Sequence, residues 1–331
     1  MSLEAGDYVI TVRQLIFIAT GLAVMFLVAF LDYRVFKNSS LVALLPYLIS
    51  VLLLIIVFAF KEIRGASSWI KIGVFRLEPS EFAKVSLIIL LAKYFSLKHI
   101  EISRIRHIFI SGIYAVVPAT LAFFQPDLGS ALVMIAIWLG MLMFSGVRKS
   151  HLAAIFIVGI VISTLGWFFL LKPYQRTRIT TFINPYVDPR GTGYSTIQSR
   201  ITFGSGKILG ILGARKEERP PTSIPEPFTD FTFAAFAQKF GFVGVVVLLG
   251  AFFLLIQRIG NIGGQASNNF AKLFSLGLIT MIFTHLFINA GMNMGIMPIT
   301  GIPLTFLSHG GSHLIAVMAG IGLIQSIKLH G

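Results

Sequence analysis

The chain has 331 residues, of which 56% are hydrophobic and 12% are charged, and its mean hydropathy is +0.85. Soluble domains carry about 25% charged residues, so this composition indicates an integral membrane protein. The absence of cysteine excludes disulfides, thiolate nucleophiles and cysteine-ligated metal sites. Basic loops at anionic membrane surfaces account for the net charge of +14, with a phosphate-bearing substrate as a second explanation, and nucleic acid is not an expected partner.

Nine segments are long and apolar enough to cross a membrane as helices. In chain order they are 13–31, 41–60, 80–97, 108–124, 128–147, 151–171, 231–256, 273–293 and 311–327. Because these segments repeat along the whole length, the sequence predicts an all-α polytopic membrane protein with a single domain over residues 1–331.

The loops between these segments predict an orientation. Lysine and arginine are more frequent in one set of short loops, which places that set and the C-terminus in the cytoplasm and the N-terminus outside. The long segment 172–230 is then extracytoplasmic, and its partly apolar stretches predict short helices on the membrane surface. Prolines and glycines interrupt residues 298–313, which predicts a re-entrant segment that lines a cavity before the last helix.

Asp230 lies at the start of the apolar run 231–256. A carboxylate at the edge of a membrane is partly desolvated, which makes it a better proton acceptor and suits a general base. The alternative is that Thr229 or Asp230 only caps the helix that follows. The two roles are compatible.

Other charged side chains cluster on the same predicted outer surface. Glu81 and Lys84 are three residues apart, so they share one helix face and are expected to form an internal salt bridge. Asp127 precedes the segment 128–147, where it is expected to act as a helix cap. With Glu226 and Asp230 these acids suit chemistry on a charged lipid whose head group lies outside the membrane.

Five motifs in order make the sequence resemble the SEDS family, which includes RodA, FtsW and SpoVE. They are "GASSWIKIGVFRLEPSEFAK" (65–84), "QPDLGSALV" (125–133), "YQRTRITTFINPYVDPRGTGYSTIQSRITFGSGK" (174–207), "PEPFTDFTFA" (225–234) and "NMGIMPITGIPLTFLSHGGS" (293–312). The resemblance covers nearly the whole chain.

The resemblance implies a peptidoglycan glycosyltransferase that polymerises lipid II on the outer face of the bacterial cytoplasmic membrane, together with a class B penicillin-binding protein. It implies that Asp230 matches the essential aspartate of the family and is the general base. It also implies a substrate-binding or supporting role for a further group of positions, which are Glu81, Lys84, Asp127, Glu226, Gln198, Ser308 and Gly310. The leaving pyrophosphate needs charge neutralisation, which Lys84, loop arginines or a divalent cation such as Mg²⁺ or Mn²⁺ could supply.

The chain is most similar to RodA within this family, which implies a role in cell elongation and rod shape rather than division. It matches from the second helix of the family onward, so the first helix is expected to be missing. It departs from the usual motifs at Phe228, Lys207 and His309. Two alternatives remain open at this point: a flippase that moves lipid II across the membrane, and a non-catalytic scaffold for a penicillin-binding protein.

Overall fold

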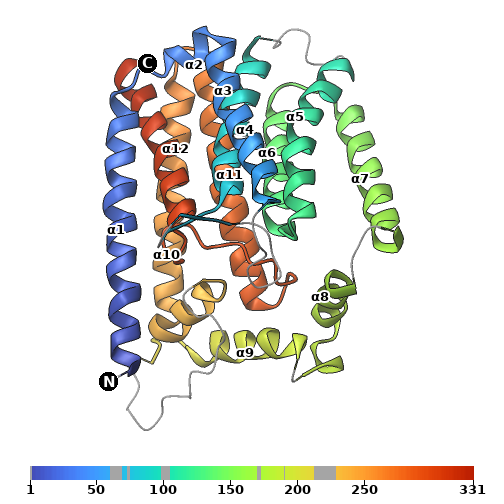
Figure 1. Ribbon diagram of the computed structural model, residues 1–331, viewed down its shortest axis with the longest axis vertical. Helices are drawn as coiled ribbons and strands as arrows, with labels where there is room; N and C mark the ends of the chain where they lie inside the picture. The colour runs from blue at the N-terminus through green and yellow to red at the C-terminus, as the bar shows by residue number, and fades with distance from the viewer. Residues whose placement is uncertain are drawn as a thin grey trace. The chain divides into compact units, whose positions relative to one another are not determined.

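The computed structural model describes residues 2–59, 69–72, 75–97, 105–169, 173–189, 191–211 and 229–331, and these residues form a helical protein (Figure 1). The chain divides into two compact units. The first unit consists of Met1–Gly146, Ile256–Thr284 and His309–Gly331, and the second consists of Val147–Leu255 and His285–Ser308. Two long helices, α10 (Thr232–Gln265) and α11 (Asn269–Met294), contribute residues to both units.

The first unit is built around α4 (Pro79–Leu97), nearly all of whose residues are buried. This helix packs against α3 (Ser40–Val57), α5 (Ile105–Phe124), α6 (Leu128–Phe144) and α12 (Gly311–His330). The short helix α2 (Arg34–Asn38) precedes α3. The burial of α4 explains why this helix can carry charged residues in an otherwise apolar unit, since a neighbouring helix covers each of its faces.

The helices α1 (Ser2–Phe30) and α12 pack side by side along their length (Figure 1). Gly322 allows this close approach, because a Cβ atom there would lie 2.5 Å from the carbonyl oxygen of Met25. Small residues at a helix interface let backbones approach closely in the membrane, where dispersion contacts drive association.

A short antiparallel hairpin leads into α4. Its strands are β1 (Ile70–Ile72) and β2 (Phe75–Leu77), with Ile70 opposite Leu77. The sequence did not predict this hairpin. It brings Trp69 and Glu78 together at the start of α4, where the indole Nε1–H donates a hydrogen bond of 3.1 Å to the carboxyl group.

The second unit contains helices and parts of helices from the stretch of chain between α6 and α12. They are α7 (Lys149–Phe169), α8 (Pro173–Ile183), the 3₁₀ helix η1 (Pro185–Val187), α9 (Thr192–Ser205), the first part of α10 and the last part of α11. Short helices are therefore present in the segment 172–230, as the sequence predicted, while residues 212–228 lie outside the described ranges. Gly241 has a φ of 68° and interrupts the helical backbone inside α10.

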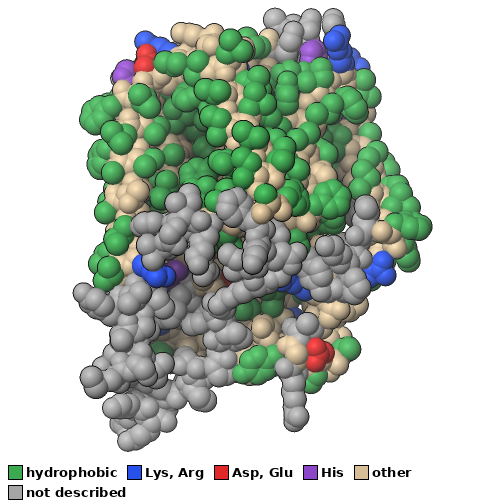
Figure 2. Space-filling view, viewed as in Figure 1, with side chains coloured by type: hydrophobic (Ala, Val, Ile, Leu, Met, Phe, Trp, Pro, Cys, Tyr) green, Lys and Arg blue, Asp and Glu red, His purple; other side chains and the backbone are tan. Residues whose placement is uncertain are grey.

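Seven helices in the described ranges are long and apolar enough to span a membrane: α1, α3, α5, α7, α10, α11 and α12. Hydrophobic side chains cover most of the visible surface of these helices, with charged side chains near their ends (Figure 2). Soluble monomers rarely expose apolar patches of this size, so this surface is suited to lipid. The other two predicted segments also form helices: α6 is a shorter apolar helix, and α4 contains Glu81, Lys84 and Lys93.

Candidate active site

Asp230 lies in the turn before α10, and its side chain is partly exposed. The carbonyl oxygen of the preceding residue, Thr229, accepts hydrogen bonds from the hydroxyl groups of Ser308 (2.7 Å) and Thr232 (3.0 Å). A Cβ atom at Gly301 would lie 3.8 Å from Asp230 Oδ2, and the φ of +75° at this position favours glycine. The second unit thus brings the predicted residues Asp230 and Ser308 together and places the carboxylate beside a residue without a side chain.

Two asparagines that the sequence analysis did not single out hold the backbone of Asp230. Asn289 Nδ2 and Asn293 Nδ2 both donate to the Asp230 carbonyl oxygen, at 3.2 Å and 3.0 Å. Asn289 Nδ2 also donates to the Ile302 carbonyl (2.7 Å), and Asn293 Oδ1 accepts from the backbone N–H of Ala234 (3.1 Å). Two amides four residues apart inside an apolar helix are the signal that could have revealed them, since buried polar groups in membrane helices must be hydrogen-bonded.

The segment after α9 is attached to α10 by backbone hydrogen bonds around the break at Gly241. The bonds run from Ile211 N to Gln238 O (3.0 Å), from Phe242 N to Lys207 O (2.9 Å) and from Val243 N to Ile208 O (3.1 Å). Glycines allow the contact, because a Cβ atom at Gly206 would lie 2.1 Å from Ala237 O. These bonds attach the segment after α9 to the part of α10 around Gly241, in the helix that follows Asp230.

Two further predicted site residues, Gln198 and Glu226, belong to the long segment 172–230 that ends at Asp230. Gln198 is partly buried in α9, next to Ser199, whose hydroxyl donates to the Asn293 carbonyl at 2.9 Å. Glu226 lies outside the described residues. Gln198 is therefore one residue away from the network that contacts Asn293.

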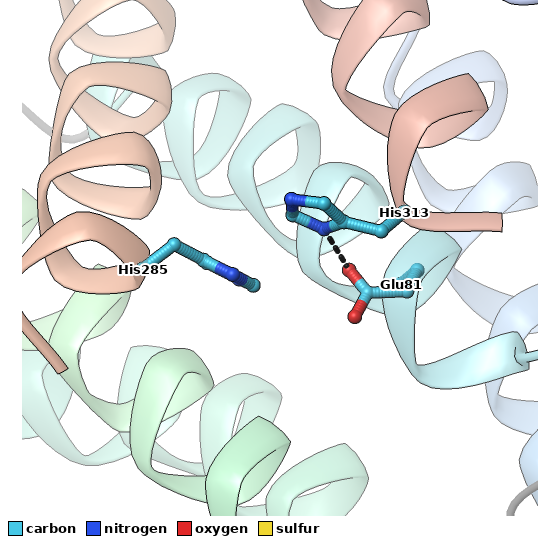
Figure 3. A group of neighbouring side chains, drawn as sticks. All are labelled: Glu81, His285 and His313. Carbon is cyan, nitrogen blue, oxygen red and sulfur yellow. Dashed lines mark hydrogen bonds and ion pairs between the residues drawn. The ribbon is translucent and has the colours of Figure 1, made fainter. Parts of the chain in front are cut away.

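In the first unit, Glu81 forms the salt bridge that its spacing from Lys84 predicted. The distance from Lys84 Nζ to Glu81 Oε1 is 2.8 Å, and the two side chains are 0% and 1% exposed. His313, in the first turn of α12, contacts the other oxygen through Nδ1 at 2.8 Å (Figure 3). Both oxygens of this buried carboxylate are thus engaged by nitrogen atoms, as a buried charge requires.

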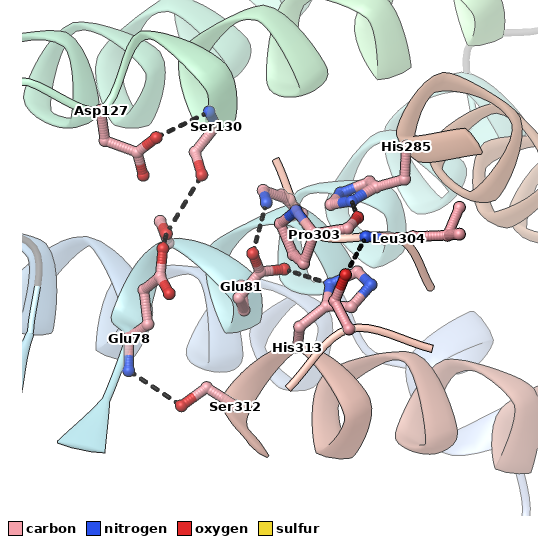
Figure 4. A network of polar contacts seen from close by, with 12 residues as sticks. Glu78, Glu81, Asp127, Ser130, His285, Pro303, Leu304, Ser312 and His313 are labelled. Atoms are coloured by element: carbon pink, nitrogen blue, oxygen red, sulfur yellow. Dashed lines mark hydrogen bonds and ion pairs between the residues drawn. The ribbon is translucent and has the colours of Figure 1, made fainter. Parts of the chain in front are cut away.

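Two more acids lie in the first unit (Figure 4). Asp127 caps α6 as predicted, since its Oδ1 accepts from the backbone N–H of Ser130 at 2.9 Å. Asp127 Oδ2 is buried, and no described residue forms a hydrogen bond with it. Glu78 donates its backbone N–H to the hydroxyl of Ser312 at 2.9 Å. Loss of water around its carboxyl group, together with the nearby carboxylates of Glu81 and Asp127, raises the pKa of Glu78.

The predicted site residues are therefore distributed over both units. Asp230, Gln198 and Ser308 belong to the second unit. Glu81, Lys84, Asp127 and Gly310 belong to the first, where Gly310 is the residue before α12. The catalytic and binding roles of these residues stay predictions.

Comparison with known proteins identifies the relatives of this chain. The peptidoglycan glycosyltransferase MrdB of Escherichia coli (strain K12) is 34% identical over 316 residues, which cover 95% of this chain and 84% of the relative. The stage V sporulation protein E of Bacillus subtilis (strain 168) is 34% identical over 318 residues, covering 96% and 86%.

A solved structure supports the same relationship. A chain described as "Structural coordination of polymerization and crosslinking by a peptidoglycan synthase complex" matches with a TM-score of 0.85 and 32% identity, covering 98% of this chain and 91% of that chain. The family model for FtsW, RodA and SpoVE, described as "Cell cycle protein", matches residues 2–331. The chain therefore belongs to the FtsW/RodA/SpoVE family, as its motifs had indicated.

Proposed function

We propose that this protein polymerises lipid II into glycan strands on the outer face of the cytoplasmic membrane, with Asp230 as the general base. The chain is a multi-pass protein of the bacterial inner membrane and a peptidoglycan glycosyltransferase, in line with the names of its relatives. One observation carries the assignment of Asp230: its side chain is partly exposed beside Gly301, while backbone contacts hold its turn in place.

The proposed reaction joins a sugar 4-hydroxyl to an anomeric carbon that bears a pyrophosphate. The hydroxyl is a weak nucleophile, so Asp230 accepts its proton as the new carbon–oxygen bond forms. The bond between the anomeric carbon and the pyrophosphate oxygen breaks, and the pyrophosphate leaves with the bonding electrons. Attack from the opposite face inverts the anomeric centre.

The leaving group carries its own negative charge and needs neutralisation rather than a proton. Lys84 is fully buried and paired with Glu81, so its part in this proposal is to position the helices around it. A divalent cation such as Mg²⁺ or Mn²⁺ would neutralise phosphate charge when bound.

The topology belongs to the same proposal. In it, α4 and α6 cross the membrane in addition to the seven longer apolar spans, which gives nine helices. Residues 172–230 form an extracytoplasmic loop, and the non-helical residues after α11 form a re-entrant segment. A class B penicillin-binding protein is the proposed partner, supported by the peptidoglycan synthase complex among the similar structures. The proposed setting is cell elongation.

The test is glycan polymerisation from purified lipid II in liposomes, with the cognate class B penicillin-binding protein present. Wild type, Asp230→Asn and Asp188→Asn run side by side. Asp188 is the control, because it lies in the same long segment and its Oδ1 accepts the Gly191 N–H at 3.0 Å, a hydrogen bond that an asparagine side-chain oxygen can also accept. Polymer from wild type and Asp188→Asn alone is the expected result. Polymer from Asp230→Asn would contradict the assignment of the base.

A further inference from the structure

The peptide carbonyl of Asp230 receives two side-chain hydrogen bonds from one neighbouring helix. The Nδ2 atoms of Asn289 and Asn293 lie 3.2 Å and 3.0 Å from this oxygen, and both asparagines are 0% exposed. They are four residues apart, so they project from the same face of α11. A carbonyl oxygen has two lone pairs, and here a separate amide occupies each of them.

Each amide uses its second N–H on another part of the second unit. Asn289 Nδ2 donates to the carbonyl of Ile302, in the non-helical segment that contains Gly301 (2.7 Å). Asn293 Nδ2 donates to the carbonyl of Asn289 itself (2.8 Å). The two side chains therefore join three pieces of backbone: the turn at Asp230, the end of α11 and the segment beside the carboxylate.

Asn293 also completes the N-terminus of α10. The first N–H groups of a helix have no partner within the helix, and the N–H of Ala234 is one of them. Asn293 Oδ1 accepts this N–H at 3.1 Å. One amide thus holds both the carbonyl of Asp230 and the helix that begins two residues later, which fixes the direction in which the Asp230 side chain leaves the backbone.

We propose that Asn289 and Asn293 are positioning residues for Asp230, acting on its backbone carbonyl so that its carboxylate meets the acceptor hydroxyl in a reactive geometry. This inference rests on the proposed role of Asp230 as the base. The two amides act on the peptide group of Asp230 through its carbonyl oxygen. A displacement of about 1 Å at a reacting group can lower a rate about 100-fold, so loss of this restraint has a large kinetic effect.

Two pairs of variants test the proposal. Asn289→Ala and Asn293→Ala remove the donors to the Asp230 carbonyl. Asn289→Leu and Asn293→Leu keep a neutral side chain of similar shape without the amide donor, and they serve if the alanine variants do not fold. The matched control is Asn268→Ala, at the other end of α11, where the amide bonds Tyr33 (2.8 Å) and the Ala271 N–H (3.0 Å).

The measurement is kcat and KM for lipid II polymerisation per folded molecule, with thermal unfolding recorded for every variant. Removing the amide at Asn289 or Asn293 is expected to lower kcat about 10-fold to 100-fold, while KM changes less than about twofold. Asn268→Ala is expected to unfold at a lower temperature and keep the kcat of wild type. A purely structural role would instead lower the folded fraction of all these variants and leave kcat per folded molecule unchanged.

Asp230→Asn in the same panel separates this inference from the proposed function. If Asp230→Asn makes no polymer but the variants at Asn289 and Asn293 keep the kcat of wild type, the positioning role of the asparagines is wrong and the role of Asp230 as the base stands. An equal fall of kcat in Asn268→Ala would also overturn it. Polymer formation by Asp230→Asn would overturn the base assignment and the inference that depends on it.

Discussion

Replacing Lys84 by methionine is expected to destabilise the protein strongly, and replacing Glu81 at the same time is expected to restore much of the loss. Lys84 and Glu81 form a 2.8 Å ion pair on α4, at 0% and 1% exposure. In Lys84→Met the carboxylate stays buried and loses the partner on one oxygen. In the double variant Glu81→Gln/Lys84→Met no buried charge of the pair remains.

The expected magnitude follows from the burial. Removing one partner of a buried ion pair costs about 3–5 kcal/mol, because it leaves an uncompensated charge. His313 still contacts the other oxygen of Glu81 at 2.8 Å, which places Lys84→Met near the lower end, about 3 kcal/mol. Neutral side chains of similar volume cost much less, so the double variant should recover about 2 kcal/mol relative to the sum of the single variants.

The assay is equilibrium unfolding in mixed detergent micelles for wild type, both single variants and the double variant. Lys93→Met on the same helix is the control, because Lys93 donates to the backbone carbonyl of Lys37 and not to Glu81. The free energies of unfolding lost in Lys93→Met and Glu81→Gln should therefore add in the double variant. Additive free energies for Glu81 and Lys84, within about 0.5 kcal/mol, would refute the reasoning. If the double variant is stable and polymerises lipid II, the ion pair of Glu81 and Lys84 only positions helices. If the double variant is stable but makes no polymer, the two charges act in the reaction.

Two further predictions concern local structure. Gly241→Ala is expected to destabilise the fold by about 2 kcal/mol or more, because φ is 68° and the new Cβ atom would lie 2.3 Å from Gly210 N. Thermal unfolding should show no such loss for Gly250→Ala, where a Cβ atom would meet no described atom within 4 Å beyond the helix's own backbone. The raised pKa of Glu78 means that its neutral form stabilises the fold below about pH 4 and that this contribution is lost as pH rises through the folded pKa. The free energy of unfolding of Glu78→Gln relative to wild type should therefore increase with pH. A difference that stays constant with pH would contradict the raised pKa of Glu78.

The helices were predictable because the predicted segments are long and mostly apolar. Helices form in all nine of them within the described residues, and seven of these helices are long and apolar enough to span a bilayer. The positions at which the helices end were less predictable. The apolar run after Asp230 ends near residue 256, yet α10 continues to Gln265, since polar residues extend a helix at no great cost once it has formed. The hairpin of β1 and β2 was missed because three-residue strands are too short to show an alternating pattern.

Site contacts were predictable only where they are local in the sequence. The spacing of Glu81 and Lys84 predicted their salt bridge, and the position of Asp127 before an apolar run predicted a helix cap. The contact between Glu81 and His313 joins residues 232 positions apart, so no local pattern reveals it. The two amides of α11 were a visible local signal, but the partner of Asn289, Asp230, lies 59 positions away and no local pattern points to it.

The described contacts also bear on which predicted carboxylate suits a proton acceptor. Glu81 has nitrogen atoms 2.8 Å from both oxygens and is 1% exposed, so a sugar hydroxyl could reach it only after these contacts break. Asp127 uses one oxygen to cap α6, and its other oxygen is buried. Asp230 is partly exposed and is held through its backbone, so its carboxylate can change protonation without the loss of those restraints. Since a base must exchange protons with substrate in every cycle, this separation of restraint from reactive group favours Asp230.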